Sequence, residues 1–494
     1  MQACPINLRY ASLFFLFDEE DDMKCVRSTL YKLLVISIIM MLIAGTVFAS
    51  GKSENKTPSK TTDKVYEPES VGMDSEVLSE GISRVVNTYI ENKTIPGAVV
   101  LVARHGKICY HEAFGEMQPG VPMTTDAIFS LVSMSKTPIA AAAMKLVDEG
   151  KILLTDPVSM YVPELANMTV AVEKEDGSID LVPAERELTL HDFLNMTTGI
   201  FRPTNNTGDP AADAYTGNAV MDFVGDLMRD SGVKTGCDDY DLTIEENAKI
   251  VAKIPLIFQP GSGFAYTDPS VDVLGYILEE VSGMPLDQLM EESLYKPLGM
   301  VDSSFYPEDE KISRIPSMVW GGGPGTPEEL FGEWWERDFV HGGYGCCPLG
   351  LGGVLGEHKK WFSGAGGIFS TSYDFFRFAE MMLNKGTLDG ERILSRQAVE
   401  MMTTNQIGDY TNTFWDNRWG YMVDIQEDNV PDLPFDHQNG GIGAYGWMGA
   451  AGTRWYANPN EDTVIVFMSQ LWFLWNILPA TERVANIVNQ SIID

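Results

Sequence analysis

Both ends of the chain carry the same two structural elements in mirrored order, and this restricts the possible folds more than any other feature of the sequence. Residues 75–93 place apolar side chains at helical spacing, and residues 97–115 hold two apolar runs around a polar turn. Residues 452–470 repeat the two-run pattern, and residues 481–490 repeat the helical spacing. Apolar runs around a turn indicate a β-hairpin, and a 3.6-residue period indicates an amphipathic helix.

This arrangement predicts an α/β (α+β) fold, in which one antiparallel sheet is built from both chain ends and flanked by helices. The sheet domain then comprises residues 69–130 and 365–494. The long middle, residues 131–364, predicts an inserted, mostly helical domain with long loops. Two stretches rich in turn residues, 200–242 and 318–364, are expected to be either a rim beside the substrate or plain surface insertions.

The first 49 residues are expected to be a leader outside the folded body. Met23 is a second and more plausible start of translation, because basic residues and the apolar run 33–48 follow it. Residues 1–22 are then an overlong extension of the predicted start. Small residues before the cut predict cleavage after Ala49 and a secreted or periplasmic mature chain. The alternative is an uncleaved anchor, since the apolar run approaches the roughly 20 residues that span a bilayer. Residues 50–68, rich in Lys, Ser, Thr and Pro, predict a flexible linker.

The charge balance excludes nucleic acid as a partner. The chain has 35 Lys+Arg against 70 Asp+Glu, a formal net charge of −35, whereas binding to phosphates needs clustered basic residues. With 44% hydrophobic residues the chain can bury a large core, so we expect the surplus acid on a solvated surface and not at a cation site. Contact with a membrane is expected only through the leader, if the leader stays uncleaved.

The cysteines predict neither a disulfide framework nor a metal site. Two of the six belong to the leader, and the others are scattered, with no CxxC spacing. We therefore expect no metal or other cofactor, and leave open whether any of the remaining cysteines pair. These are Cys109, Cys237, Cys346 and Cys347.

The strongest local signal is Ser133 three residues before Lys136, at the start of an alanine-rich stretch that ends near Gly150. Residues three apart on a helix lie on one face. A serine hydroxyl becomes nucleophilic when a neighbour accepts its proton, and a lysine can do so if desolvation or positive potential lowers its pKa. The positive helix end supplies such potential, and the Ser133 N–H can help to hold an oxyanion. The alternative is an ordinary helix start with a surface lysine.

Four further segments follow this motif in a defined order. Together the five segments resemble the sequence boxes of serine β-lactamases, penicillin-recognising D,D-peptidases and related esterases, particularly the class C-like branch. The resemblance covers roughly residues 70 to 490. The four segments are 188–200, 260–268 with the apolar helix pattern after it, 298–305 and 364–371.

The resemblance implies a role for each matching residue. Ser133 is the acylated nucleophile, Lys136 is its proton partner, and Tyr266 matches the tyrosine that shuttles protons between nucleophile and leaving group. Asp268 occupies a position that is usually Asn. An ionised carboxylate only accepts hydrogen bonds, so this departure argues against recognition of the substrate by an amide side chain at that position.

A last segment, Trp447-Met448-Gly449, lies where β-lactamases hold Lys-Thr-Gly, whose cation and hydroxyl bind the substrate carboxylate. The segment is closer to the W-x-G of family VIII esterases. The resemblance implies that Gly449 lets an acyl group lie against the strand and that the Ala450 N–H completes the oxyanion hole. The alternative is a glycine-rich edge strand with a packing tryptophan.

Two other basic residues are candidates to replace the missing lysine. Arg454 or His437 can supply a compensating charge, although a structural or exposed role fits each better. The literal Lys-Thr-Gly at 234–236 precedes Tyr266 and lies in an acidic stretch without strand character, so we interpret it as a coincidence.

These observations predict a secreted serine hydrolase that works through a Ser133 acyl-enzyme. We expect a carboxylesterase acting on a small-molecule ester, with amides or peptides as a broader substrate class. One alternative is a β-lactamase or D,D-peptidase. A second is a penicillin-binding-like sensor or binding protein that has lost its chemistry.

Overall fold

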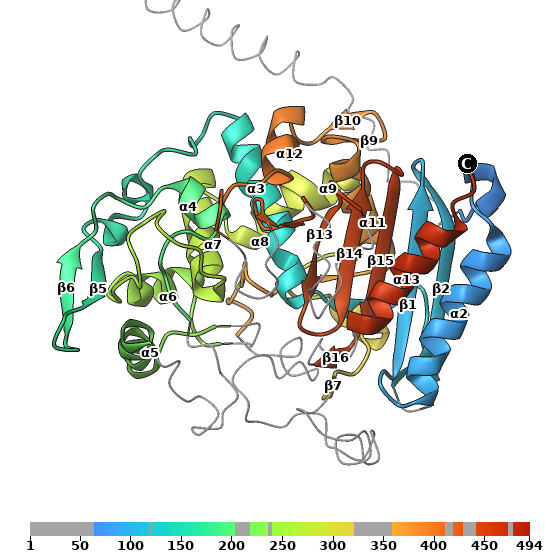
Figure 1. Cartoon of the computed structure of the whole chain (residues 1–494), viewed down its shortest axis with the longest axis horizontal. Coiled ribbons are helices and arrows are strands. Elements are labelled where there is room, and N and C mark those ends of the chain that lie inside the picture. The colour runs from blue at the N-terminus through green and yellow to red at the C-terminus, as the bar shows by residue number, and fades with distance from the viewer. Residues whose placement is uncertain are drawn as a thin grey trace, which may run out of the picture. The chain divides into compact units, whose positions relative to one another are not determined.

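The central sheet is built from strands at both ends of the chain. In the computed structural model, eight antiparallel strands follow one another across it in the order β11 (Arg418–Trp419), β12 (Asp424–Ile425), β13 (Tyr445–Gly449), β14 (Thr453–Asn458), β15 (Thr463–Ser469), β1 (Gly97–Arg104), β2 (Lys107–Gln118) and β3 (Val121–Pro122). Strand β1 pairs directly with β15, from Ala98 opposite Ser469 to Arg104 opposite Thr463. Figure 1 shows these blue and red strands side by side. The predicted sheet is therefore confirmed.

The structure describes residues 64–118, 120–202, 218–235, 240–320, 358–410, 418–427, 441–472 and 478–494. The predicted leader, Cys237, Cys346, Cys347, His437 and most of the 318–364 stretch lie outside these ranges. Within them, no helix has the length and hydropathy that crossing a bilayer requires.

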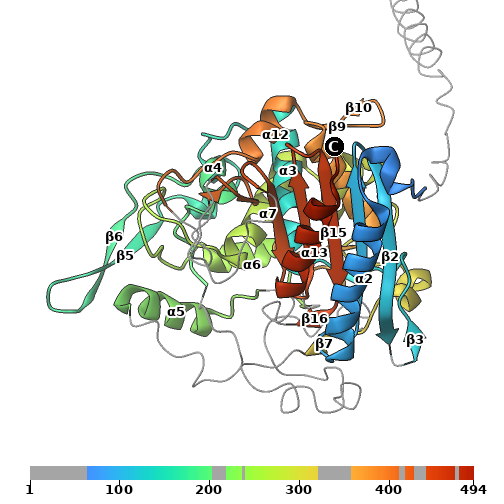
Figure 2. The same cartoon turned by 45° about the vertical axis from the view of Figure 1, so that its right-hand side comes forward.

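Two helices from opposite chain ends cover one face of the sheet, α2 (Ser75–Glu91) and α13 (Leu478–Ser491). Asp74 caps α2 by accepting a hydrogen bond from the Val77 N–H. Alternate residues of β1, such as Val100 and Val102, pack into this helical layer. Both helices were predicted, and Figure 2 shows them lying together across the strands.

The opposite face of the sheet packs against the larger core. Val99 and Leu101 of β1 point into it, so β1 is buried on both sides, as its unbroken apolar sequence requires. Helix α11 (Ser372–Leu383) lies directly on β14 and β15. Beyond it lie α3 (Lys136–Asp148) and α7 (Asp268–Ser282), whose first residues belong to the candidate site.

The middle of the chain is mainly helical, with two features that the sequence analysis missed. Strands β5 (Thr169–Glu173) and β6 (Ile179–Pro183) form a separate hairpin. The loop predicted at 200–242 contains helix α5 (Ala219–Ser231), so that part of the prediction is wrong. Asn218 caps α5 at one end and Gly232, with φ of 80°, ends it. Both signals were present in the sequence.

Shorter elements connect these parts. In chain order they are β4 (Phe129–Ser130), η2 (Val132–Ser135), α4 (Leu190–Leu194), α6 (Ile244–Val251), α8 (Leu286–Met290), α9 (Lys296–Leu298), β7 (Val319–Trp320), β8 (Phe369–Ser370), β9 (Thr387–Leu388), β10 (Glu391–Arg392), α12 (Arg396–Met402) and β16 (Leu471–Trp472).

Candidate functional site

The segment that carries Ser133 is a tight passage from strand to helix. Strand β4 ends at Ser130, the 3-10 turn η2 includes Ser133, and α3 begins at Lys136. Val132, just before the serine, has a φ of 47°. A β-branched residue in this left-handed region is strained, and such strain concentrates at functional sites.

Strands β13 and β14 lie against this passage and hold it in place. Thr453 donates its hydroxyl to the Leu131 carbonyl over 3.0 Å. A Cβ at Gly449 would come within 2.0 Å of that carbonyl oxygen. Glycine is therefore required at 449, because the strand approaches the backbone next to the serine so closely. Ala450, proposed for the oxyanion hole, begins the turn that follows.

Lys136 is fully buried and is surrounded by three oxygen atoms. Its Nζ donates to Ser133 Oγ over 2.9 Å and to the Ala365 carbonyl over 2.7 Å. Asp268 Oδ1 lies 2.7 Å from the same nitrogen.

The pKa of Lys136 is raised, whereas the sequence analysis made its role as a proton acceptor depend on a lowered pKa. Burial lowers this pKa, but Asp268 and Tyr266 together outweigh burial. The sequence did not show that a buried anion would lie within ion-pair distance of the lysine. In the resting site Lys136 is a cation.

Asp268, at the start of α7, lies between two cations. One carboxylate oxygen faces Lys136 and the other pairs with Arg202. Burial raises the pKa of Asp268, yet Arg202 and Lys136 together lower it to about 2. Both oxygens of Asp268 are thus engaged by the protein's own cations. Arg202 was missed in the sequence, although it lies two residues after the 188–200 segment.

Tyr266 lies against two tryptophans. Trp447 Nε1 donates to Tyr266 Oη over 3.2 Å, and the ring centroids of these residues are 5.4 Å apart. Trp419 meets Tyr266 edge-on at 6.0 Å and Trp447 at 4.4 Å. Lys136 Nζ lies 5.0 Å from the centre of the Tyr266 ring. An uncharged indole N–H therefore contacts the tyrosine from the strand segment that carries Lys-Thr-Gly in β-lactamases.

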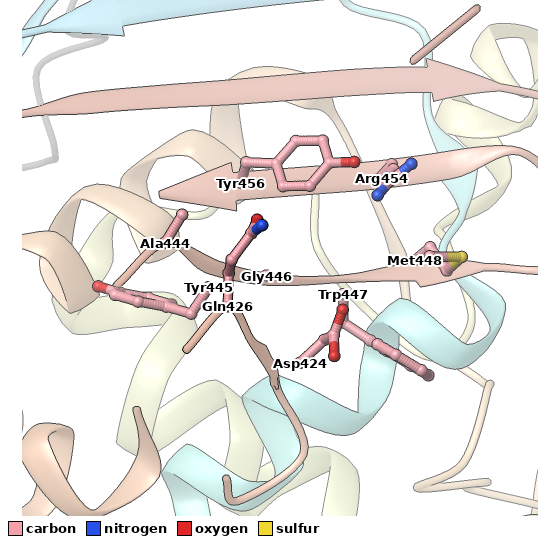
Figure 3. Close-up of a pocket in the computed structure, with 9 residues that line it drawn as sticks. All are labelled: Asp424, Gln426, Ala444, Tyr445, Gly446, Trp447, Met448, Arg454 and Tyr456. Carbon is pink, nitrogen blue, oxygen red and sulfur yellow. The ribbon is translucent and has the colours of Figure 1, made fainter. Parts of the chain in front are cut away.

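Arg454 faces away from this group. On the sheet it lies opposite Met448, which alternates with Trp447 and so points to the other face. Figure 3 shows Arg454 beside Tyr456 and Met448, in a pocket of about 340 Å³ that includes its open mouth. The guanidinium pairs with Glu482 and lies 4.2 Å from the Tyr456 ring centre. The structural alternative for Arg454 is confirmed.

Other sequence candidates also lie apart from the site. Lys234 belongs to a loop after α5, where its backbone N–H binds the Asn247 side chain. Cys109 is a free, buried thiol in the described chain, and burial raises its pKa to about 12. Among the residues that the structure describes, no group of three or more His, Cys, Asp or Glu side chains could hold a metal ion.

Comparisons with known proteins agree with the family resemblance of the sequence segments. A family model described as Beta-lactamase matches residues 82–481. An uncharacterized protein of Mycobacterium tuberculosis is 30% identical over 387 residues, which are 76% of this chain and 86% of that protein. The esterase EstB of Burkholderia gladioli is 26% identical over 402 residues, which are 79% and 90% of the two chains.

A solved structure has the same fold. This is the structure of EstCE1, described as a hydrolase with promiscuous acyltransferase activity. The match has a TM-score of 0.64 at 23% identity and covers 83% of this chain and 99% of that one.

Proposed function

The chain belongs to the serine β-lactamase-related family, and on that premise we propose that it is an exported carboxylesterase that forms an acyl-enzyme on Ser133. One observation carries the proposal, namely the contact of Lys136 Nζ with Ser133 Oγ beside Tyr266. Attack by Oγ on an ester carbonyl forms a tetrahedral intermediate. Loss of the alcohol then leaves the acyl group on Ser133, and water releases it.

In this mechanism Lys136 stabilises charge and Tyr266 transfers protons. Lys136, held as a cation by Asp268, stabilises negative charge that develops on the Ser133 oxygen. In its phenolate form, Tyr266 takes up the serine proton and, as the resulting phenol, passes that proton to the leaving alcohol. The Trp447 N–H orients the phenol and stabilises its oxygen when it carries charge.

The surroundings of Tyr266 favour esters over β-lactams. β-Lactams carry a carboxylate that family β-lactamases bind with the lysine of Lys-Thr-Gly. Here Trp447 offers only a neutral N–H, Arg454 pairs with Glu482 on the other face, and Arg202 pairs with Asp268. A neutral ester needs no such cation. The relationship to an esterase at 26% identity also supports this choice.

Mass spectrometry after incubation with a fluorophosphonate tests the nucleophile. We expect one adduct on Ser133 and none in Ser133→Ala. We also expect Lys136→Ala to remain folded and to lose acylation by about a thousandfold or more, since a positioned group of this kind supplies several kcal/mol. An unlabelled wild-type protein would refute the enzyme assignment.

A substrate panel tests the ester preference. It compares p-nitrophenyl esters, nitrocefin and a D-alanyl-D-alanine peptide at equal enzyme concentration. We expect turnover of the esters to exceed that of the other two by at least a hundredfold. Comparable turnover of nitrocefin would support a β-lactamase instead, and preferred cleavage of the peptide would support a D,D-peptidase.

A further inference from the structure

A second buried carboxyl lies one helical turn after Asp268. Asp272 is 1% exposed, on the same helix α7. Its Oδ1 accepts hydrogen bonds from Ser363 Oγ over 2.7 Å and from the Ala365 N–H over 3.1 Å. Its Oδ2 is buried without a hydrogen-bond partner in the part of the chain that the structure describes. The mechanism proposed above gives this residue no role.

Asp272 is linked to the nucleophile through one peptide segment. Ala365 donates its backbone N–H to Asp272, and its carbonyl accepts a hydrogen bond from Lys136 Nζ. The same Lys136 nitrogen contacts Ser133. The position of the Ala365 carbonyl therefore helps to set the direction in which the ammonium faces the serine.

The segment itself is packed against α7 with little room to shift. A Cβ at Gly364 would come within 2.9 Å of the Val271 carbonyl oxygen. A Cβ at Gly367 would come within 2.9 Å of both the Phe305 ring and the Ser363 carbonyl oxygen. The contact between Gly364 and α7 lies next to Ser363 and Ala365, which donate the two hydrogen bonds to Asp272.

We propose that Asp272 is a positioning residue for Lys136, acting through the Ser363–Ala365 turn. Its Oδ1 fixes the turn, the Ala365 carbonyl takes one N–H of the ammonium, and a second N–H is thereby directed at Ser133 Oγ. The inference rests on the proposed function, because the direction of the ammonium matters only if Ser133 is acylated.

The acceptor oxygen of Asp272 matters here, and its charge does not. Burial raises the pKa of Asp272 to about 7, although the hydrogen bonds from Ser363 and the Ala365 N–H oppose this rise and the charges of Asp268 and Lys136 have smaller, opposite effects. Both of these hydrogen-bond donors are neutral groups. Oδ1 can accept both hydrogen bonds in either protonation state, and so can the oxygen of an amide. Asparagine at position 272 should therefore keep Lys136 in place and preserve Ser133 labelling, whereas alanine should not.

Asp374 offers a matched control. It is also 1% exposed, accepts from a backbone N–H (Asp302, 2.7 Å) and a serine hydroxyl (Ser303, 3.0 Å), and has a pKa that burial raises to about 7. Its turn does not include a residue bound to Lys136. A purely structural defect should look alike at the two positions.

The experiment measures the rate of Ser133 labelling by a fluorophosphonate between pH 6 and 10, together with thermal stability, in the full chain. We expect Asp272→Asn to stay within threefold of wild type with an unchanged pH profile. Asp272→Ala should label at least tenfold more slowly, with a displaced profile. Asp374→Ala should lose stability but label at the wild-type rate with the wild-type profile.

Two results would overturn the inference. One is an Asp272→Ala protein that labels like wild type, and the other is a folded Asp272→Asn protein that is as slow as the alanine variant. If Asp272→Ala does not fold, Ser363→Ala serves in its place, because it removes one of the two hydrogen-bond donors to Asp272. This variant should slow Ser133 labelling by a smaller factor and displace the pH profile in the same direction. An unchanged pH profile in Ser363→Ala would overturn the inference. Failure of the wild type to label would instead refute the proposed function.

Discussion

Asp268 places a carboxylate oxygen 2.7 Å from the Nζ of Lys136, in a position where the family usually carries an asparagine. The ion pair holds the lysine in its charged form although the side chain is fully buried. Replacing the anion by the family's amide is thus the most direct way to learn which form of Lys136 the reaction uses.

Asp268→Asn should move the basic limb of the pH–rate profile to lower pH. In wild type the Asp268 anion raises the pKa of Lys136, so the cation persists to high pH. Without that anion, burial dominates and the cation is lost earlier as pH rises. The measurement is the rate of fluorophosphonate labelling of Ser133 from pH 6 to 10. If the acid limb moved instead and labelling at neutral pH accelerated, Lys136 would act as a neutral base.

Trp447→Phe should lower kcat about five- to tenfold with little change in KM. The ring packing on Tyr266 is kept, but the N–H that binds Tyr266 Oη is lost, and one such hydrogen bond contributes about 1 kcal/mol. The matched control is Trp455→Phe on the neighbouring strand, whose Nε1 is buried without a partner among the described residues. Steady-state kinetics with a p-nitrophenyl ester compares the two, and equal effects would exclude a specific role for the Trp447 N–H.

Stability should fall as pH rises from about 5 to 8. Burial raises the pKa of Asp272, Glu279, Asp374 and Glu380 to about 7 in the folded chain, whereas unfolded carboxyls titrate near 4. Between these values the four carboxyls bind more protons in the folded state than in the unfolded state, which outweighs the opposite effect of His111 and His191, whose pKa values burial lowers. The free energy of unfolding therefore decreases with pH. Thermal unfolding at each pH measures this trend.

The control for this trend is Asp374→Asn, which removes one titrating group and should flatten the slope. Below about pH 4 the opposite effect sets in. The pKa of Asp268 is lowered to about 2, so its stabilisation is lost as the pH falls through that range. A stability that rose steadily from pH 5 to 8 would contradict the assignment of raised pKa values.

The proposed export predicts a mature chain that begins at Ser50. Intact-mass analysis of protein from the medium or periplasm should show loss of everything up to Ala49. Ala49→Arg should block cleavage, because the position before the cut requires a small residue. An active protein that stays in the membrane with its leader intact would favour the anchor alternative.

The pattern of the chain ends was sufficient to predict the sheet. Apolar runs at 97–115 and 452–470 left few ways to bury both strands other than next to each other, and β1 does pair with β15. The hairpin β5–β6 and helix α5 were missed for different reasons. Helix α5 has a clear apolar periodicity, with Val224 and Met228 buried four residues apart, but the turn residues around it led us to interpret the whole stretch as a loop. Strands β5 and β6 are short and partly exposed, so neither carries a long apolar run.

In the site, local motifs were sufficient to choose the residues that meet, but not to predict their electrostatics. Ser133 and Lys136 are neighbours on one turn, so their contact follows from spacing. The position of Arg202 and Asp272 depends on how loops and α7 pack around the lysine, and nothing local to either residue indicates it. The direction of the Lys136 pKa shift depends on its buried partners, so the sequence could state only the condition under which this lysine would act as a base.

The pairing of β1 with β15 also limits when the chain can fold. The two strands are joined across a separation of 372 residues, where Ser469 Oγ binds the Gly97 carbonyl. Contacts this distant in sequence form late, because a long loop must close before they stabilise anything. Strands β1 and β2 can pair early, but the edge of β1 that faces β15 remains unpaired until nearly all of the described chain has been made. For the export that we propose, this incomplete sheet should help to keep the chain open until it has passed through a translocation channel.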